Sequence, residues 1–115
     1  MKTFKIKTAL LLAILTSFWS AYLNAGELKW SDELPGRVDW AESSLQCQEK
    51  GMRLPLRKEI EAAHKAGTTS AWDYGLYWTS EEHETNTERA YVFNFDFKSA
   101  YDTRKSDKIN ARCVK

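Results

Sequence analysis

Residues 89–98 carry the pattern that decides the fold class, and they read Arg89-Ala-Tyr-Val-Phe-Asn-Phe-Asp-Phe-Lys98. Every second position in the middle of this stretch is a large ring, in the order Tyr91, Phe93, Phe95 and Phe97. Because successive side chains of a strand point to opposite faces, the alternation predicts a β-strand with one aromatic face. The other face is then expected to direct Asn94 and Asp96 outward.

Further extended segments are predicted on both sides of this strand. Residues 75–80 contain the β-prone run Tyr77-Trp78-Thr79, and residues 81–88 contain no apolar residue, which is typical of a polar loop. Residues 98–102 are expected to turn, and residues 101–104 and 109–114 are expected to form further strands. Residues 28–30 predict a short strand at the start of the domain.

A first helix is predicted to begin at residue 40. Asp39 stands where its carboxylate can cap the first turn, and Glu42 can reach back from three residues later. Gly51 suits the left-handed conformation in which many helices end. The spacing places Leu45 and Cys47 on the inward side of this helix.

A second helix is predicted over residues 57–66, after the break at Pro55 and before Gly67. Its apolar side is expected to include Ile60, with His64 half-buried beside it as a structural histidine. Two helices followed by antiparallel strands predict an α+β domain in which the helices pack on a small twisted antiparallel sheet.

Residues 1–25 have the order of a secretory signal. Three lysines precede an apolar run over residues 9–19, and a smaller, more polar stretch then ends at Ala25. This run is shorter than the roughly 20 residues that a membrane span needs, so cleavage after Ala25 is expected to leave residues 26–115 as one domain. The predicted location is therefore the periplasm, the cell surface or the exterior, with no membrane span after cleavage.

The composition of residues 26–115 limits the classes of partner. Removal of the signal leaves 14 Lys plus Arg against 16 Asp plus Glu, a net charge of about −2. A slightly acidic domain has no overall attraction for nucleic acid or an anionic bilayer. No nucleic-acid partner is therefore predicted.

Cys47 and Cys113 are the two cysteines of the chain. An oxidising compartment favours pairing them, and two cysteines allow only one intramolecular disulfide. The alternative is a metal site, but two distant cysteines with His64 and His83 do not give recognisable ligand spacing. A disulfide with no metal or cofactor is the favoured prediction.

Several short motifs together resemble a known bacterial family. They are, in chain order, Val38-Asp39-Trp40-Ala41-Glu42, Cys47, Gly51-Met52-Arg53-Leu54-Pro55, Arg57-Lys58-Glu59-Ile60, Tyr77-Trp78-Thr79-Ser80 and Ala111-Arg112-Cys113-Val114-Lys115. In this order they resemble the C-terminal domain of bacterial collagen-like adhesins, a domain otherwise described as of unknown function. The resemblance covers nearly all of residues 26–115.

The resemblance implies a C-type-lectin-like fold, related to that of formylglycine-generating enzymes, with the early and late cysteines bridged. It also implies export and recognition of sulfated polysaccharides, often by trimers. This chain lacks a collagen repeat before the domain, so its oligomeric state is left open. It also has Leu56 where a helix-capping Thr or Ser is expected.

The function predicted from these features is a non-catalytic binding module for a glycan. Both cysteines are expected in the disulfide, and no Ser, His and acid grouping has a recognisable signature, so catalysis is not predicted. A partner or inhibitor of an envelope protein is the alternative. Ligand-binding residues are expected on the C-terminal half, namely Asn94, Asp96, Lys98, Tyr101 and Arg104.

Two local alternatives accompany this site. Lys98, Arg104, Lys105 and Lys108 could hold a sulfate or carboxylate, but a solvated strand edge that prevents aggregation is the favoured interpretation. The polar loop carries oxygen donors that suggest calcium, although their spacing matches no calcium loop: Glu81, Glu82, Glu84 and Asn86.

Overall fold

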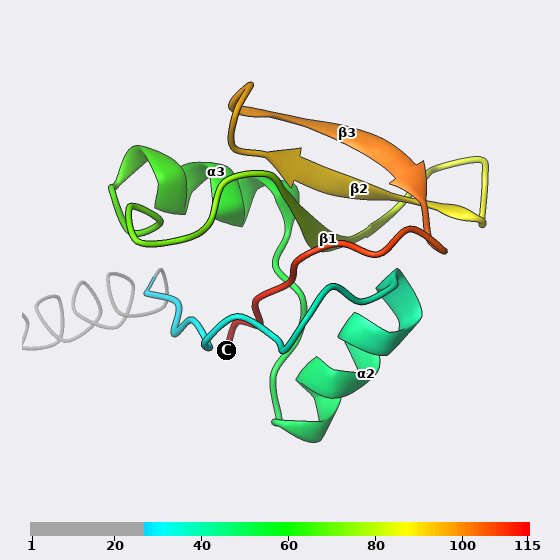
Figure 1. Ribbon diagram of the computed structural model, residues 1–115, viewed down its shortest axis with the longest axis horizontal. Helices are drawn as coiled ribbons and strands as arrows, with labels where there is room; N and C mark the ends of the chain where they lie inside the picture. The colour runs from blue at the N-terminus through cyan, green and yellow to red at the C-terminus, as the bar shows by residue number, and fades with distance from the viewer. Residues whose placement is uncertain (1–26) are drawn as a thin grey trace, which may run out of the picture.

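The computed structural model describes residues 27–115, so the signal predicted at residues 1–25 lies outside the described part of the chain. Two helices, α2 (Trp40–Glu49) and α3 (Arg57–Lys65), precede three strands, β1 (Leu76–Glu82), β2 (Arg89–Asn94) and β3 (Ser99–Arg104) (Figure 1). The strands form an antiparallel sheet in the order β1-β2-β3. The predicted α+β class is confirmed.

Both predicted helices are present, with the expected local ends. Asp39 Oδ1 accepts a hydrogen bond from the Glu42 amide at 2.8 Å, which caps α2. Glu42 does not reach back, however, because its carboxylate accepts from Gln46 Nε2 at 3.0 Å. Gly51 follows α2 with a φ of 69°, the left-handed conformation that favours glycine. Leu45 was expected to face inward and is 50% exposed.

Helix α3 begins without a side-chain cap from Leu56, and two carboxylates supply the acceptors instead. Glu59 accepts from the Leu56 amide at 2.7 Å, and Glu81, at the end of β1, accepts from the Arg57 amide at 2.6 Å. Helix N-termini favour negative charge because their first N–H groups lack intrahelical partners. Glu81 therefore fixes α3 to the sheet.

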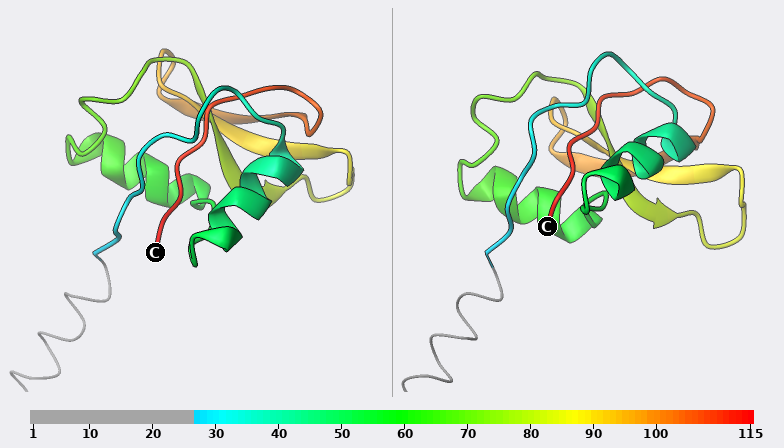
Figure 2. Two further views of the ribbon diagram at one scale, coloured as in Figure 1. Left: turned by 60° about the horizontal axis from the view of Figure 1, so that its bottom comes forward. Right: turned by 90° about the horizontal axis from the view of Figure 1, so that it is seen from below.

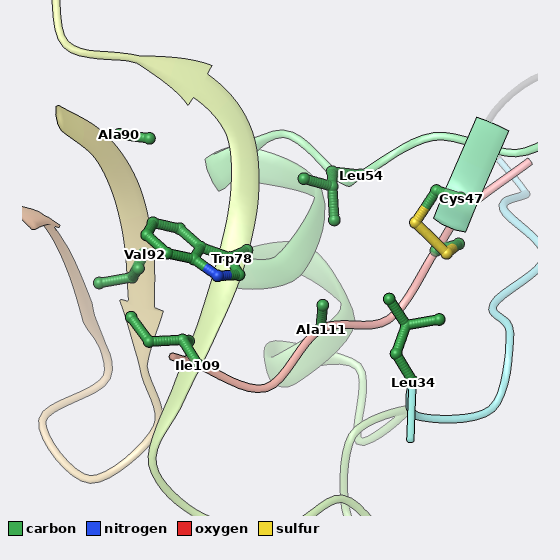
Figure 3. Packing of buried hydrophobic residues seen from close by; sticks show 9 residues of the cluster. Leu34, Cys47, Leu54, Trp78, Ala90, Val92, Ile109 and Ala111 are labelled. Carbon is green, nitrogen blue, oxygen red and sulfur yellow. A yellow bond between two sulfur atoms is a disulfide. The ribbon is translucent and has the colours of Figure 1, made fainter. Parts of the chain in front are cut away.

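Strand β2 is buried on both faces, because each face of the sheet has its own core. Trp78, Ala90 and Val92 pack with the disulfide region and the C-terminal segment on one face (Figure 3). Tyr77, Phe93, Phe95 and Ile60 form the second cluster, which lies against α3. The alternation predicted one buried and one outward face, and this part of the prediction is wrong.

The alternating sequence also continues beyond the strand. Strand β2 ends at Asn94, a turn covers residues 95–98, and β3 begins at Ser99, where a turn was predicted over residues 98–102. Phe97 was expected on the aromatic face and is 77% exposed. Lys98 closes the turn with a φ of 56°.

The two ends of the described chain run side by side (Figure 2). Backbone hydrogen bonds join Lys29 to Lys115 and Ser31 to Cys113, and single bridges replace the strands predicted at residues 28–30 and 109–114.

The Cys47–Cys113 disulfide, with an S–S length of 2.04 Å, is confirmed. It ties α2 to the C-terminal segment. Within residues 27–115, no helix is long and apolar enough to cross a membrane.

Candidate binding surface

The structure does not bring the five predicted binding residues together. Asp96 and Lys98 lie in the turn between β2 and β3, whereas Arg104 ends β3. A strand rises about 3.3 Å per residue, so the six steps from Lys98 to Arg104 span roughly 20 Å. Tyr101 and Arg104 are three positions apart on β3 and therefore point to opposite faces of the sheet.

Asn94 is not part of an outward surface, because only 6% of it is exposed. Its Oδ1 accepts hydrogen bonds from the amides of Asp96 at 2.8 Å and Phe97 at 3.1 Å. A side-chain oxygen that binds the backbone two and three residues on holds a tight turn in place of a ladder. The predicted outward direction of Asn94 is thus wrong, and the side chain ends β2.

The four basic residues that suggested an anion site are largely tied to acids. Lys105 Nζ contacts Glu82 and lies 4.3 Å from the centre of the Trp40 ring. Lys108 lies 3.4 Å from Asp39, and Arg104 lies 3.6 Å from Asp107. Lys98 stands apart from them in the β2–β3 turn. These ion pairs favour the interpretation as a solvated strand edge.

The acidic residues proposed for calcium do not converge on one point. Glu81 binds Arg57, whereas its neighbour Glu82 contacts Lys105 on the other face of the strand. Burial raises the pKa of the Glu81 carboxyl, but its hydrogen bonds with Arg57 outweigh this and hold the pKa below the ordinary value. Within residues 27–115, no three His, Cys, Asp or Glu side chains are grouped to hold a metal.

The remaining acid, Glu84, belongs to a contact between α3 and β2. Its carboxylate accepts from the Tyr91 hydroxyl at 2.8 Å, and the Arg57 guanidinium lies 3.7 Å from the centre of the Tyr91 ring. The hydrogen bond to Glu84 raises the pKa of Tyr91, because it stabilises the protonated hydroxyl. These side chains connect the helix to the sheet and leave no oxygen set directed at a ligand.

A shallow pocket lies instead at the end of the sheet where β1 begins. We call it the aromatic pocket, and it is lined by His64, Gly67, Thr69, Ser70, Trp72, Asp73, Tyr74 and Phe95. The segment after α3 supplies most of these residues. Phe95 is the first residue of the turn after β2, and its amide donates to the Gly75 carbonyl at 3.0 Å.

The rings at the base of this pocket are fixed by a network of buried aromatic contacts. The centre of the Trp72 ring lies 4.9 Å from that of Trp30 and 5.8 Å from that of Phe95. Arg112 covers Trp72 with its guanidinium 4.6 Å from the ring centre. The centre of the Tyr77 ring lies 5.3 Å from that of Trp72. Trp72 is therefore held in place, as a binding surface requires.

The rim of the aromatic pocket is polar and exposed. Tyr74 is 81% exposed, and Asp73 and Ser70 are also exposed. His64 is half-buried, as predicted, and its Nδ1 lies 3.3 Å from the Thr69 hydroxyl. The pocket thus combines ring faces with a carboxylate and hydroxyl groups.

Of the predicted binding residues, Asp96 and Lys98 lie at this same end of the sheet, since the β2–β3 turn directly follows Phe95 (Figure 1). Trp72, Asp73 and Tyr74 were not among the binding residues predicted from the sequence. A signal was present, because this run combines two rings with a carboxylate in a connection between a helix and a strand, and connections often carry binding residues.

The fold and its bridge define the class of the protein as a small, disulfide-closed α+β domain. Residues 30–115 match the model of a family described as Domain of unknown function (DUF8780), and the chain belongs to this family. No curated protein matches the chain.

Proposed function

We propose that this protein is a non-catalytic module that binds a glycan outside the cytoplasm, and that the aromatic pocket is its binding site. The observation that carries the proposal is the pairing of the fixed Trp72 with the exposed Tyr74 around one hollow. Ring faces pack on the apolar faces of sugars, while carboxylate and hydroxyl oxygens hydrogen-bond to sugar hydroxyls. Tyr74 is 81% exposed, so its ring is available for such contacts.

The proposal includes a C-type-lectin-like fold and the periplasm or cell exterior as the location. Two helices packed on an antiparallel sheet, with the early and late cysteines bridged, support that fold. The disulfide fits an oxidising compartment. Both cysteines are bonded, which leaves neither as a nucleophile and supports a binding role.

The structure favours stacking over charge as the source of affinity. The resemblance to adhesin domains implied sulfated polysaccharides, but three of the four basic residues predicted for them are paired with acids. Surface charges neutralised in this way attract an anion weakly. We therefore propose that ring contacts at the aromatic pocket provide most of the binding energy.

Tyr74→Ala tests this proposal, with Tyr101→Ala as the matched control. Both tyrosines are exposed, so neither change should lower the free energy of unfolding by more than about 0.5 kcal/mol. Tyr74→Ala should weaken glycan binding at least tenfold on a glycan array and by calorimetry, and Tyr101→Ala should leave it unchanged. Loss of binding only in Tyr101→Ala would place the site on β3. Capture of one envelope protein, with no sugar bound, would favour the alternative of a protein partner.

A further inference from the structure

A second hollow meets the aromatic pocket at Tyr74. It is lined by Arg37, Tyr74, Gly75, Leu76, Lys108, Ile109 and Asn110, so the same tyrosine contributes to both. We propose that the two hollows are adjacent subsites of one site, and that the ligand is a glycan chain of at least two sugar units lying across Tyr74. This inference rests on the proposed function.

The backbone explains why Tyr74 stands between the two hollows. Gly75 follows it with a φ of 111°, a conformation that side-chain-bearing residues rarely adopt, and β1 begins at the next residue. The chain therefore turns sharply at this point. Asp73, before the tyrosine, lines the aromatic pocket, whereas Gly75 and Leu76, after it, line the second hollow.

The second hollow has the composition of a sugar subsite. Ile109 and Leu76 supply an apolar wall, with Ile109 only 5% exposed. Arg37 and Asn110 supply hydrogen-bond donors, and neither side chain has a hydrogen-bond partner among residues 27–115. Lys108, the other cation, is held 3.4 Å from Asp39.

The two hollows offer different hydrogen-bonding groups, which gives the site a direction. The aromatic pocket contains the Asp73 carboxylate, which when ionised only accepts hydrogen bonds, whereas the second hollow contains the Arg37 guanidinium, whose five N–H groups only donate them. A ligand that satisfies both groups must place different substituents on either side of the Tyr74 ring. A single sugar unit would fill only one of the hollows, and water would occupy the other.

Both hollows are partly open to solvent. An enclosed pocket would select the end of a chain, whereas an open pair of subsites lets the chain continue at either side. Adjacent subsites raise affinity because the second sugar is already held close by the first, so little additional freedom is lost. Affinity should therefore increase from one sugar unit to two or more.

The experiment is an NMR titration of the isotope-labelled domain with glucose, N-acetylglucosamine, mannose and galactose, and with their β-1,4-linked dimers to tetramers. At least one series should bind tenfold or more tightly as the dimer than as the monomer, with shifted amides on both sides of Tyr74. Arg37→Ala should remove this gain and leave monomer binding unchanged. Arg104→Ala, which alters an exposed arginine at the far end of β3, is the matched control and should change neither.

The outcomes separate the inference from the proposed function. Equal affinity for monomer and oligomers, with shifts confined to residues 64–74 and Phe95, would overturn the two-subsite inference and leave the glycan-binding module intact. An Arg37→Ala variant that kept the full gain would also overturn it. If no sugar in the titration shifted any amide around Tyr74, the proposed function itself would be wrong.

Discussion

Replacing Cys47 and Cys113 together with alanine should remove a large fraction of the stability of the domain. The disulfide joins residues 66 positions apart. In the chain-entropy model, closing a loop of this length destabilises the unfolded chain by about 4 kcal/mol at 25 °C. A domain of this size has a total stability on the order of 5–10 kcal/mol, so the loss is a large fraction of it.

The expected change can be measured by urea unfolding followed through tryptophan fluorescence. The midpoint should fall, and heating should show a melting temperature lower by roughly 15–30 °C, since about 1 kcal/mol corresponds to 4–8 °C in small domains. The m-value, which is the slope of the free energy of unfolding against urea concentration, should rise, because the unfolded chain exposes more surface when it is not crosslinked. The native protein should also resist reductant, because both cysteines are completely buried.

Two results would refute this reasoning. A decrease of less than about 1 kcal/mol in the free energy of unfolding would show that the disulfide constrains the unfolded chain little, contrary to the loop-closure estimate. A loss of the expected size with no change in the urea slope would assign the effect to the native state, where two buried sulfur atoms pack in the core. A reduced wild-type sample, which keeps both sulfur atoms, separates these cases.

Two further changes test individual contacts. Asn94→Ala should lower the free energy of unfolding by about 1–2 kcal/mol in urea, because two turn amides lose their acceptor. Asn94→Asp keeps that acceptor and should lose less, whereas unchanged stability in Asn94→Ala would restore this side chain as a binding candidate. Glu59→Gln should be less stable than wild type above about pH 4.5, the unfolded carboxyl pKa. Arg53 lowers the pKa of Glu59 in the folded state, so the stabilisation that the Glu59 carboxylate gives is lost as pH falls through that lower pKa. A stability difference between wild type and Glu59→Gln that stayed constant down to pH 2 would contradict this.

The helices could be predicted from the sequence because their signals are local. Asp39 caps a helix by binding an amide only three residues away, and Gly51 and Gly67 each adopt the left-handed conformation directly after a helix. Such contacts depend on a few neighbouring residues and little on the rest of the fold. The strand at residues 89–94 was found for the same reason, since alternation is also a local pattern.

The end of that strand could not be predicted from alternation. The pattern of rings continues through Phe97, but the buried Asn94 side chain binds the following amides and turns the chain. Burial of both faces of β2 was equally hidden, because it depends on α3 covering one face and the C-terminal segment covering the other. These are long-range contacts, and the residues next to β2 in the sequence do not indicate them.

The aromatic pocket was missed because rings have two uses in a small domain. Trp78, Tyr77 and Phe93 serve the core, since each is at most 2% exposed. Tyr74 differs only in its surroundings, which the fold creates by bringing Phe95 beside the segment after α3. The sequence alone therefore shows which aromatic residues the domain contains, but not which of them are exposed.

The exposed rings favour the end of the sheet where β1 begins as the site of the proposed ligand. Tyr74 and Phe97, which are 81% and 77% exposed, lie at the end where β1 begins and β2 turns into β3. At the opposite end, Arg104 and Lys105 are engaged by acids. A ligand held by ring contacts has its strongest attachment where rings are held in place, and Trp72 is held by Trp30 and Arg112 beside the exposed Tyr74. In the proposed binding mode, the ligand therefore contacts the segment after α3 and the adjacent β2–β3 turn, and not the far end of β3.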